Sequence, residues 1–420
     1  MTARAHVHDH DSGQGLLPLE AARERILGRI SPLAPQRRLL PDAHGCVTVA
    51  EIAAPTDLPT FASSAMDGFA LRAADVEGAT PDRPVPLRIA GRIRMGHRPE
   101  AAVSAGEAVA IPTGGVIPEG ADSVMPIEAC VVEGERVLVL QPSDPGKHVR
   151  RAGEDVRAGE VLVPSGRRIM APELGLLAAA GLAEVDVRPP ARVLVVSTGD
   201  ELVAPGEAAG LGRVHDANVF TLYGQIREAG ALPHAGGIVR DDPQALVEAL
   251  VSGLDRADVL VSSGGISVGE HDPVKAAFRG RGDVEFLEVA MQPGKPQAFG
   301  FVEARPYFGL PGNPVSVFVS FEVLVRPALM RMMGRPEDRL QVAATLESDI
   351  TGPRGKEQYA RVHLRREGDR WLARSTGGRQ SNLLATVSRA NGLAIVPAGV
   401  ETARAGDEVR VILFRAPEDR

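Results

Sequence analysis

The chain has 420 residues, of which 44% are apolar and 24% are charged, and its formal net charge is −7. This length exceeds the roughly 250–300 residues at which a single core stops growing, so more than one domain is expected. The acidic balance, together with one Trp, three Tyr and eleven Phe, argues against a basic or stacking surface for nucleic acid.

The two cysteines, Cys46 and Cys130, are too few for a disulfide framework and too far apart for a thiolate metal site. No signal-peptide core opens the chain, and no run approaches 18 apolar residues. We therefore expect a soluble, cytoplasmic protein with no membrane partner. Residues 1–14 predict a disordered tail, although a metal cluster could be drawn from their histidines and aspartates: His6, His8, His10, Asp9 and Asp11.

Helical periodicity predicts an amphipathic helix over residues 19–30, and residues 47–60 look extended. Short β-like runs then alternate with Gly/Pro turns between residues 84 and 140, at 85–90, 108–111 and 137–140. A further helix is expected at 172–180. These patterns predict a small mostly-β domain set within an α/β scaffold that is split in the sequence.

From Arg192 onward, short apolar runs are separated by helical patterns, which is the signature of a parallel sheet. The predicted strands are 192–196, 234–239, 258–261 and 306–310. The helix after Asp242 begins with Pro243, and its apolar face is predicted from Leu246, Val247, Leu250, Val251 and Leu254. Beyond residue 336 the pattern is β again, at 340–346, 359–364, 371–374, 393–396 and 408–413.

We therefore predict a multidomain α/β and β fold without internal repeats. Its parts are the tail (1–14), a split α/β linker domain (15–62 and 146–190), an inserted mostly-β domain (63–145), a parallel α/β sheet domain (191–336) and a C-terminal β-barrel-like domain (337–420).

Four polar loops follow the predicted parallel strands, at the edge where such sheets bind ligands. They are Ser197-Thr-Gly-Asp-Glu201, Arg240-Asp-Asp242, Ser262-Ser-Gly-Gly265 continuing to Asp272, and Leu310-Pro-Gly-Asn-Pro314. Glycine lets backbone approach a phosphate, and hydroxyls add donors. A single such loop could be an ordinary turn, but four on one edge favour a phosphate site.

Carboxylates follow the same strands, and they would repel a phosphate unless a cation lay between them. Glu201, Asp241 and Asp272 offer oxygen ligands only, which favours Mg²⁺ over Zn²⁺. Asp242 is expected to cap the following helix, which leaves Asp241 free for another role.

Three further stretches could carry chemistry, although each has an ordinary structural reading. Asp67 in Ser63–Ala70 is by itself typical of a turn aspartate, and the segment Lys147–Asp155 is typical of a solvated loop, although its Lys/Arg group could clamp an oxyanion. The third is Pro112–Asp122. His271 is expected to be structural.

Together these stretches resemble the molybdopterin molybdenumtransferase family, which includes bacterial molybdenum-insertion proteins and the C-terminal domain of gephyrin. The resemblance covers about residues 18–414. Its motifs are Ser64-Ala-Met-Asp-Gly68, Pro112-Thr-Gly, Arg151-Ala-Gly-Glu-Asp155, Ser197-Thr-Gly-Asp-Glu201, Ser262-Ser-Gly-Gly-Ile-Ser-Val-Gly269, Pro293-Gly-Lys-Pro296 and Leu310-Pro-Gly-Asn-Pro314.

The resemblance implies an elongated homodimer with a molybdopterin-binding sheet domain, and a cleft shared between that domain and the inserted and linker domains of the other subunit. It implies Mg²⁺-dependent insertion of molybdate into adenylylated molybdopterin, with release of AMP. Molybdopterin adenylyltransferase and molybdoenzyme-maturation proteins are the protein partners that it suggests, with no nucleic acid and no membrane.

The resemblance also assigns site residues. Catalytic roles fall to Glu201, Asp241, Asp272, Asp67, Thr113 and Asp155, of which Glu201, Asp241 and Asp272 would hold the metal. Cofactor-binding roles fall to Ser197, Thr198, Gly199, Ser263, Gly264, Gly265, Gly269, Lys295, Pro311, Gly312, Asn313, Pro314, Arg150 and Ser381.

The chain departs from the family pattern at four positions. Gln292 stands where many members carry a lysine, and Glu288 stands where some do; the loss of these cations affects anion binding more than the fold. Phe69 replaces a usual tyrosine, and Ser63 replaces a frequent asparagine or aspartate. Three alternatives stay open: a molybdopterin adenylyltransferase, a binding scaffold like that of gephyrin, and a tungstate-selective or weakly active paralogue.

Overall fold

The computed structural model describes residues 15–266, 273–278 and 283–417. The His-rich tail therefore lies outside the described residues. The chain divides into two compact units, each with its own core: unit 1 comprises residues 1–36, 45–47 and 188–420, and unit 2 comprises residues 37–44 and 48–187.

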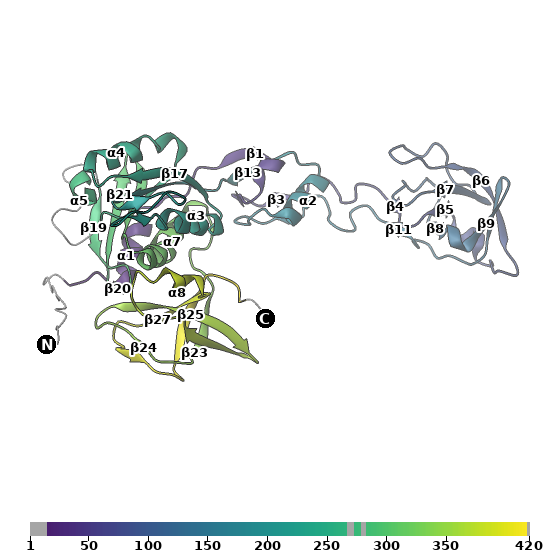
Figure 1. The fold of residues 1–420 in the computed structure, drawn as a ribbon. Coiled ribbons are helices and arrows are strands. Elements are labelled where there is room, and N and C mark those ends of the chain that lie inside the picture. Colours follow the sequence, from purple (N-terminus) through teal and green to yellow (C-terminus); the bar gives the residue numbers. More distant parts are fainter. Residues whose placement is uncertain (1–14, 267–272, 279–282, 418–420) are drawn as a thin grey trace, which may run out of the picture. The chain divides into compact units, whose positions relative to one another are not determined.

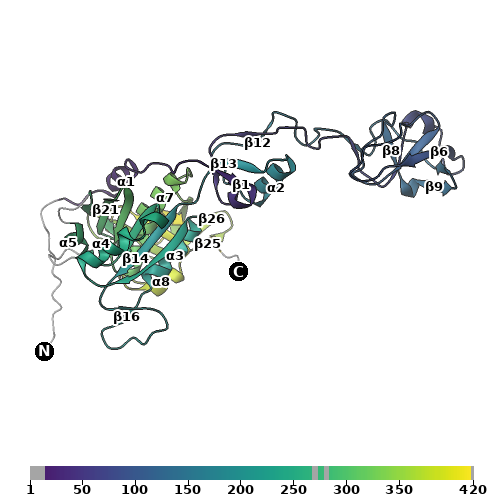
Figure 2. The same cartoon turned by 90° about the horizontal axis from the view of Figure 1, so that it is seen from above.

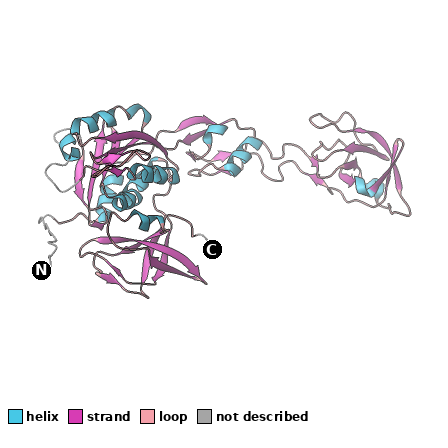
Figure 3. Ribbon diagram, viewed as in Figure 1, coloured by secondary structure: helices cyan, strands magenta, loops and turns pink. Residues whose placement is uncertain are grey.

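Unit 2 is built mainly from short strands, as the Gly/Pro-punctuated β pattern predicts (Figure 3). Its largest sheet has six strands in the order β8-β5-β7-β6-β10-β9, and Phe69, Leu71 and Leu87 lie in its core. Between residues 36 and 188 the elements are β1 (Gln36–Leu39), β2 (Val47–Thr48), β3 (Ile52–Ala53), β4 (Ser63–Ser64), β5 (Gly68–Leu71), β6 (Val85–Arg92), β7 (Glu107–Ile111), β8 (Ser123–Pro126), β9 (Cys130–Glu133), β10 (Arg136–Val139), β11 (Val149–Arg150), β12 (Val161–Val163), α2 (Ala171–Ala179) and β13 (Glu184–Arg188).

Unit 1 contains a sheet in the order β17-β14-β18-β22-β21-β19, with helices on both faces (Figure 1). The first four strands are parallel, and β21 and β19 add an antiparallel edge that the sequence pattern does not predict. The elements up to residue 332 are α1 (Leu19–Leu27), β14 (Arg192–Thr198), β15 (Leu202–Val203), β16 (Val214–His215), α3 (Asn218–Glu228), β17 (Leu232–Val239), α4 (Pro243–Val251), β18 (Val259–Ser263), α5 (Pro273–Phe278), β19 (Glu285–Glu288), β20 (Met291–Gln292), β21 (Pro296–Val302), β22 (Arg305–Leu310), α6 (Pro314–Ser320) and α7 (Arg326–Met332).

The central strand β14 is buried on both faces, which explains its continuous apolar run. Val193 and Val195 pack in one cluster with residues of α1, α3, α6 and α7, whereas Leu194 and Val196 pack in another with residues of α4 and α5. Figure 2 shows α3 lying beside β14, in agreement with this packing.

The structure of helix α4 differs from the prediction at one residue of its apolar face. Leu246 and Leu250 are fully buried, but Val251 is 44% exposed, so its predicted place on the buried face is wrong. Val251 is the last residue of α4, and the chain turns away after it at Ser252. The i, i+4 pair Leu246 and Leu250 forms the buried centre of this face, and Val247 and Leu254 pack against the same cluster.

The C-terminal segment forms a closed β-barrel. Its sheet runs β20-β25-β26-β23-β29-β27, and additional pairing between β25 and β27 closes the ring. Its elements are β23 (Gln341–Leu346), β24 (Ile350–Thr351), β25 (Glu357–Glu367), β26 (Arg370–Ser375), α8 (Leu384–Ser388), β27 (Gly392–Val396), β28 (Thr402–Ala403) and β29 (Glu408–Leu413).

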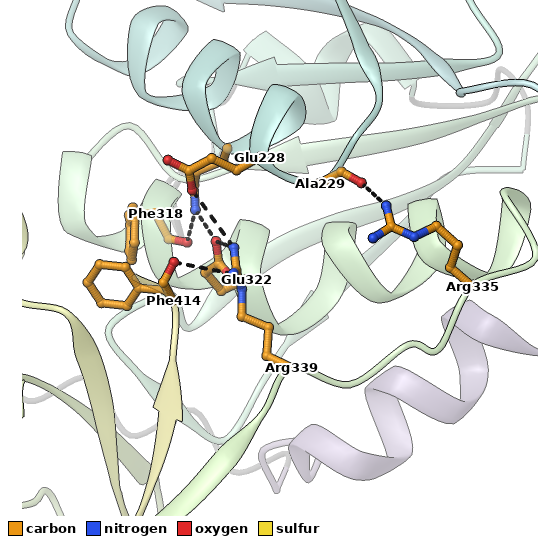
Figure 4. A network of polar contacts seen from close by, with 8 residues as sticks. Glu228, Ala229, Phe318, Glu322, Arg335, Arg339 and Phe414 are labelled. Atoms are coloured by element: carbon orange, nitrogen blue, oxygen red, sulfur yellow. Dashed lines mark hydrogen bonds and ion pairs between the residues drawn. The ribbon is translucent and has the colours of Figure 1, made fainter. Parts of the chain in front are cut away.

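A buried ion pair joins the sheet helices to the chain that enters the barrel (Figure 4). Glu322 lies in a π-helical turn, Phe321–Val325, with its side chain fully buried. Arg339 Nε donates to Glu322 Oε2 at 2.6 Å, and Gln225 Nε2 donates to Glu322 Oε1 at 2.9 Å. Both carboxylate oxygens of Glu322 therefore have donors, which offsets the cost of burying this group. No helix in the described part of the chain has the length and apolar character needed to cross a membrane.

Candidate functional site

The structure brings the polar loops after the four parallel strands to one edge of the sheet. Gly264 N–H, after β18, donates to the carbonyl of Leu310 at the end of β22, at 3.1 Å. Gly199 N–H, after β14, donates to the carbonyl of Val239 at the end of β17, at 3.2 Å. Loops far apart in sequence therefore share this edge, where parallel sheets bind ligands.

Glycine is required where these loops meet. Gly264 has φ +97°, and a Cβ atom there would lie 2.2 Å from the carbonyl oxygen of Thr198. Gly265 follows at φ +66°, and a Cβ on Gly312 would lie 3.6 Å from Gly264 Cα. At Gly264 two loop backbones thus approach each other more closely than a side chain would permit, whereas a Cβ on Gly312 would make an ordinary contact.

Asn218, the first residue of α3, holds two of these loops together. Its Nδ2 donates to Ser263 Oγ and to the carbonyl of Gly312, both at 2.8 Å. Sequence reasoning missed this residue because an asparagine at a helix start is typical of a cap. The polar residues of the segment His215-Asp-Ala-Asn218, just before and at the start of α3, were the sequence feature that could have pointed to Asn218.

Several buried polar atoms at this edge have no hydrogen-bond partner within the described residues. They are Ser197 Oγ, Thr198 Oγ1, Asp216 Oδ2 and Asn218 Oδ1. Native interiors leave few polar groups unpaired, so a group of four indicates a place that a ligand or water completes. Ser197 and Thr198 were predicted from the sequence; Asp216 was not.

Asp216 has two different carboxylate oxygens. Oδ1 accepts from the N–H groups of Asn218 and Val219, at 3.1 and 3.2 Å, and so caps α3. The residue is only 2% exposed, and it lines an otherwise apolar hollow of about 370 Å³ with Phe220 and Tyr223. The free Oδ2 can accept one hydrogen bond from a buried ligand.

The acidic residues at this edge lie after β14 and β17. Asp200 and Asp241 each accept the other residue's N–H, at 3.4 Å, and Glu201 folds back over Gly199. Asp242 caps α4 as expected, because its Oδ1 accepts from two N–H groups at 2.8 Å. Asp241 is therefore free of the cap.

The expected metal ligands are tested only in part. Asp272 and Gly269 lie outside the described residues. Among residues 15–266, 273–278 and 283–417, no three His, Cys, Asp or Glu side chains are placed to hold a metal. Glu201 and Asp241 are nevertheless exposed beside the glycine loops, and their carboxylate oxygens could serve as metal ligands. Such a pair suits Mg²⁺, which is commonly held by one or two carboxylates together with substrate phosphates.

Lys295 lies between β20 and β21, and its ammonium is 3.2 Å from the carboxylate of Glu288. After β22 come Pro311, Gly312, Asn313 and Pro314, and Pro314 begins α6. The carbonyl of Ser381, in the barrel segment, accepts from Val315 N–H at 3.0 Å. The Pro311–Pro314 loop and Ser381 are therefore adjacent in unit 1.

A buried arginine of the barrel was also missed by sequence reasoning. Arg361 is 3% exposed; it donates to Thr386 Oγ1 at 3.1 Å and to the carbonyl of Gly378, and it has no acidic partner among the described residues. Burial lowers its pKa. Gln358 on the same strand is fully buried with both amide atoms unpartnered, and both residues line a hollow of about 200 Å³. An amide donor and a cation without an acidic partner suit an oxyanion, although Asp349 lines the same hollow.

The remaining predicted residues belong to unit 2. Thr113 N–H donates to Asp67 Oδ1 at 2.8 Å, and Arg150 pairs with Ser63 in the neighbouring ladder. Asp155 lies in another segment, where its N–H donates to the carbonyl of Leu58 at 3.1 Å. Asp67 and Thr113 are thus brought together, and no described contact joins Asp155 to them.

The fold defines a parallel α/β sheet domain with glycine-bearing polar loops at one edge, followed by a closed β-barrel, and comparisons with known proteins specify the family. Residues 17–181 match the MoeA N-terminal region (domain I and II), residues 194–331 match a probable molybdopterin binding domain, and residues 343–414 match the MoeA C-terminal region (domain IV).

Individual relatives agree with these matches. Molybdopterin molybdenumtransferase 2 of Mycobacterium tuberculosis is 41% identical over 380 residues, which cover 89% of this chain and 93% of that protein. Molybdopterin molybdenumtransferase 1 of the same species is 36% identical over 417 residues, covering 94% and 98%. The crystal structure of a molybdopterin biosynthesis MoeA protein from Pyrococcus horikoshii superposes with a TM-score of 0.79 at 33% identity, covering 96% of this chain and 100% of that one.

The chain belongs to the molybdopterin molybdenumtransferase family. It is accordingly a transferase of molybdenum cofactor biosynthesis.

Proposed function

We propose that the protein inserts molybdenum from molybdate into adenylylated molybdopterin, in a Mg²⁺-dependent reaction that releases AMP. One observation carries the proposal: the close backbone approach of Gly264 to Thr198 lies beside the buried hydroxyls of Ser197 and Thr198, which have no partner within the described residues. Backbone close approach and hydroxyl donors are what a phosphate-bearing substrate requires.

In this proposal, different residues of the chain bind different parts of the substrates. Loop N–H groups and the Lys295 ammonium would bind the substrate's phosphates, and Asp216 Oδ2 would accept a hydrogen bond from a buried part of the substrate. Arg361, with the neutral amide of Gln358, would bind the tetrahedral oxyanion. Fixed donors of this kind stabilise developing negative charge without reorganising during the reaction.

Glu201 and Asp241 would hold Mg²⁺ together with Asp272. When bound, the ion would neutralise the diphosphate and act as a Lewis acid toward the bond that breaks. No protein nucleophile is required. The exposed carboxylates near the phosphate loops support this arrangement, since two unpaired acids would otherwise repel the substrate.

We further propose a cytoplasmic homodimer in which Asp67, Thr113, Arg150 and Asp155 of the partner subunit complete the cleft. The Asp67–Thr113 contact supports a common role for these two residues. Molybdopterin adenylyltransferase and molybdoenzyme-maturation proteins are the proposed protein partners, because they would supply the substrate and receive the product.

The test compares two neighbouring aspartates with different partners. Asp241→Asn should reduce AMP release from adenylylated molybdopterin, molybdate and Mg²⁺ by about 100-fold, as loss of a metal-assisted electrostatic contribution does. Asp242→Asn is the matched control, because Asp242 is committed to the α4 cap, and it should retain most activity. Equal activity of Asp241→Asn and the native protein would exclude this role for Asp241.

Two further arms of the assay address the alternatives. Incubation with Mg-ATP and molybdopterin should give no adenylylated product, and formation of that product would favour an adenylyltransferase. Competition between molybdate and tungstate measures oxyanion preference. Stronger binding of tungstate would identify a tungstate-selective member of the family.

A further inference from the structure

One hollow in the barrel is lined by cations, and none of the described residues that line it is acidic. Its volume is about 780 Å³, and it opens between strand β25, the end of helix α8 and the chain that leaves β29. Five of its lining residues are basic: His363, Arg365, Arg366, Arg389 and Arg415. None of them belongs to the loops of the sheet edge.

One residue fixes the three segments that form this hollow. Asn391 is 4% exposed; its Oδ1 accepts from Leu364 N–H at 2.6 Å, and its Nδ2 donates to the carbonyl of Leu364 at 2.9 Å. The carbonyl of Asn391 accepts the N–H groups of Phe414 and Arg415, at 3.1 and 3.2 Å. The floor is therefore rigid, and its backbone groups are already paired, so cationic side chains are the groups left to meet a ligand.

The five cations differ in how far their charge is neutralised. Arg365 pairs with Glu347 at 2.7 Å and with Glu367 at 2.5 Å, and Arg366 lies 3.6 Å from Asp369. These acids lie outside the lining of the hollow.

Among the described residues, the charge of Arg389 is uncompensated and the charge of Arg415 is compensated only in part. The Arg389 guanidinium has no hydrogen bond or ion pair within the described residues. The Arg415 guanidinium donates to the carbonyl of Ser388 at 3.4 Å and otherwise acts through space on Glu228. Two like charges on one hollow attract an anion, and because both side chains are exposed, their mutual repulsion is weakened by solvent.

We propose that this hollow is a second anion-binding site, and that it takes a small molecule with a di- or triphosphate chain. Guanidinium groups bind phosphate oxygens in pairs, and four of them on one concavity match a chain of phosphates better than a single oxyanion. A volume of about 780 Å³ lies within the range of sites for nucleotide-sized ligands.

This proposal is independent of the proposed reaction, and its test uses the full chain with tripolyphosphate as the probe. Isothermal titration should detect one site per chain whose affinity falls as salt is raised. The variant Arg389→Gln/Arg415→Gln should weaken binding about tenfold or more, because two charge-assisted contacts are lost. Arg370→Gln removes an exposed charge outside the hollow and should change binding less than about twofold.

Two comparisons separate this site from others. Lys295→Gln removes the cation proposed for the substrate phosphates and should leave tripolyphosphate binding unchanged, and Arg389→Gln/Arg415→Gln should leave molybdenum insertion unchanged. Titration with ATP, ADP and AMP distinguishes a nucleotide from inorganic polyphosphate as the source of the phosphate chain. Binding that survives loss of both arginines, or that disappears in Lys295→Gln alone, overturns the proposal, as does tighter binding of poly-glutamate than of tripolyphosphate.

Discussion

Glu288 and Lys295 form an ion pair, with 3.2 Å between the carboxylate and the ammonium. Glu288 ends strand β19 and Lys295 immediately precedes β21, so the antiparallel pairing of these two strands brings the side chains together. The side chains are 38% and 26% exposed, so either group can also reach a ligand from solvent. The carboxylate therefore competes with any anion for the cation that we propose as a phosphate ligand.

Replacing Glu288 should strengthen anion binding. Glu288→Gln frees Lys295, and since an exposed pair contributes about 0–1 kcal/mol, the KM for the adenylylated substrate should fall about two- to fivefold with kcat little changed. Glu285→Gln on the same strand is the control, because Glu285 pairs with Arg25 and Arg29 instead. A higher KM in Glu288→Gln would indicate that the carboxylate itself supports the substrate.

The two oxygens of Asp216 can be tested separately. Asp216→Asn keeps an oxygen to cap α3 but replaces the free Oδ2 with an amide NH₂, so stability should change by less than about 1 kcal/mol. The KM for the substrate should rise about tenfold, because a buried acceptor becomes a donor. Asp216→Ala also removes the cap and should lose about 1 kcal/mol more in chemical denaturation. An unchanged KM in Asp216→Asn would show that Oδ2 does not meet the substrate.

Two glycines of unit 1 should respond in opposite directions to alanine. Gly264→Ala places a Cβ 2.2 Å from the Thr198 carbonyl oxygen at φ +97°, and it should destabilise the protein by about 2–4 kcal/mol. Gly224 lies within α3, and a methyl group there would meet open space, so Gly224→Ala should stabilise by about 0.5–1 kcal/mol. Thermal unfolding of both variants measures the difference. Similar melting temperatures would mean that the loops at the sheet edge relax freely.

The elements that the sequence predicts well are those with a strong local pattern. Strand β14 is a continuous apolar run because both of its faces are buried, and the α4 cap is visible as Asp242 followed by Pro243. The antiparallel edge of β21 and β19 was not predicted, since strand direction depends on partners distant in sequence. Nothing in the local sequence of β19 or β21 indicates whether the strand pairs in a parallel or an antiparallel direction.

The same distinction applies to the candidate site. The glycine and hydroxyl loops could be predicted because their residue types have few other uses together. Asn218 and Asp216 resemble ordinary helix-start residues, and their role is visible only when α3 lies beside Gly312 and Ser263. Arg361 stands in a strand where alternation does not show that its cation is buried without an acid.

The ion pair of Asp258 and Arg192 should make stability depend on pH. Arg192 begins β14, and it donates to Asp258 from its backbone N–H at 2.9 Å and from its guanidinium at 2.8 and 3.1 Å. Burial alone would raise the pKa of Asp258, but the hydrogen bonds from Arg192 outweigh it, so the pKa is lowered. A carboxyl whose pKa is lower in the folded state stabilises the protein at neutral pH. This contribution begins to be lost as pH falls below the ordinary Asp value of about 3.9 and is fully lost once pH has fallen through the lower folded-state pKa.

Asp258→Asn should therefore lower the free energy of unfolding by about 1–2 kcal/mol at pH 7, a range reduced because Arg192 is partly exposed. The difference from the native protein should begin to shrink as pH falls below about 4, where the carboxyl of the unfolded chain is protonated, and should vanish below the lower pKa of the folded state. Asp255→Asn is the control, since Arg192 contacts only the backbone carbonyl of Asp255. Urea denaturation at several pH values measures both variants, and a deficit of equal size at pH 7 and pH 3 would mean that the charge of Asp258 does not contribute to stability.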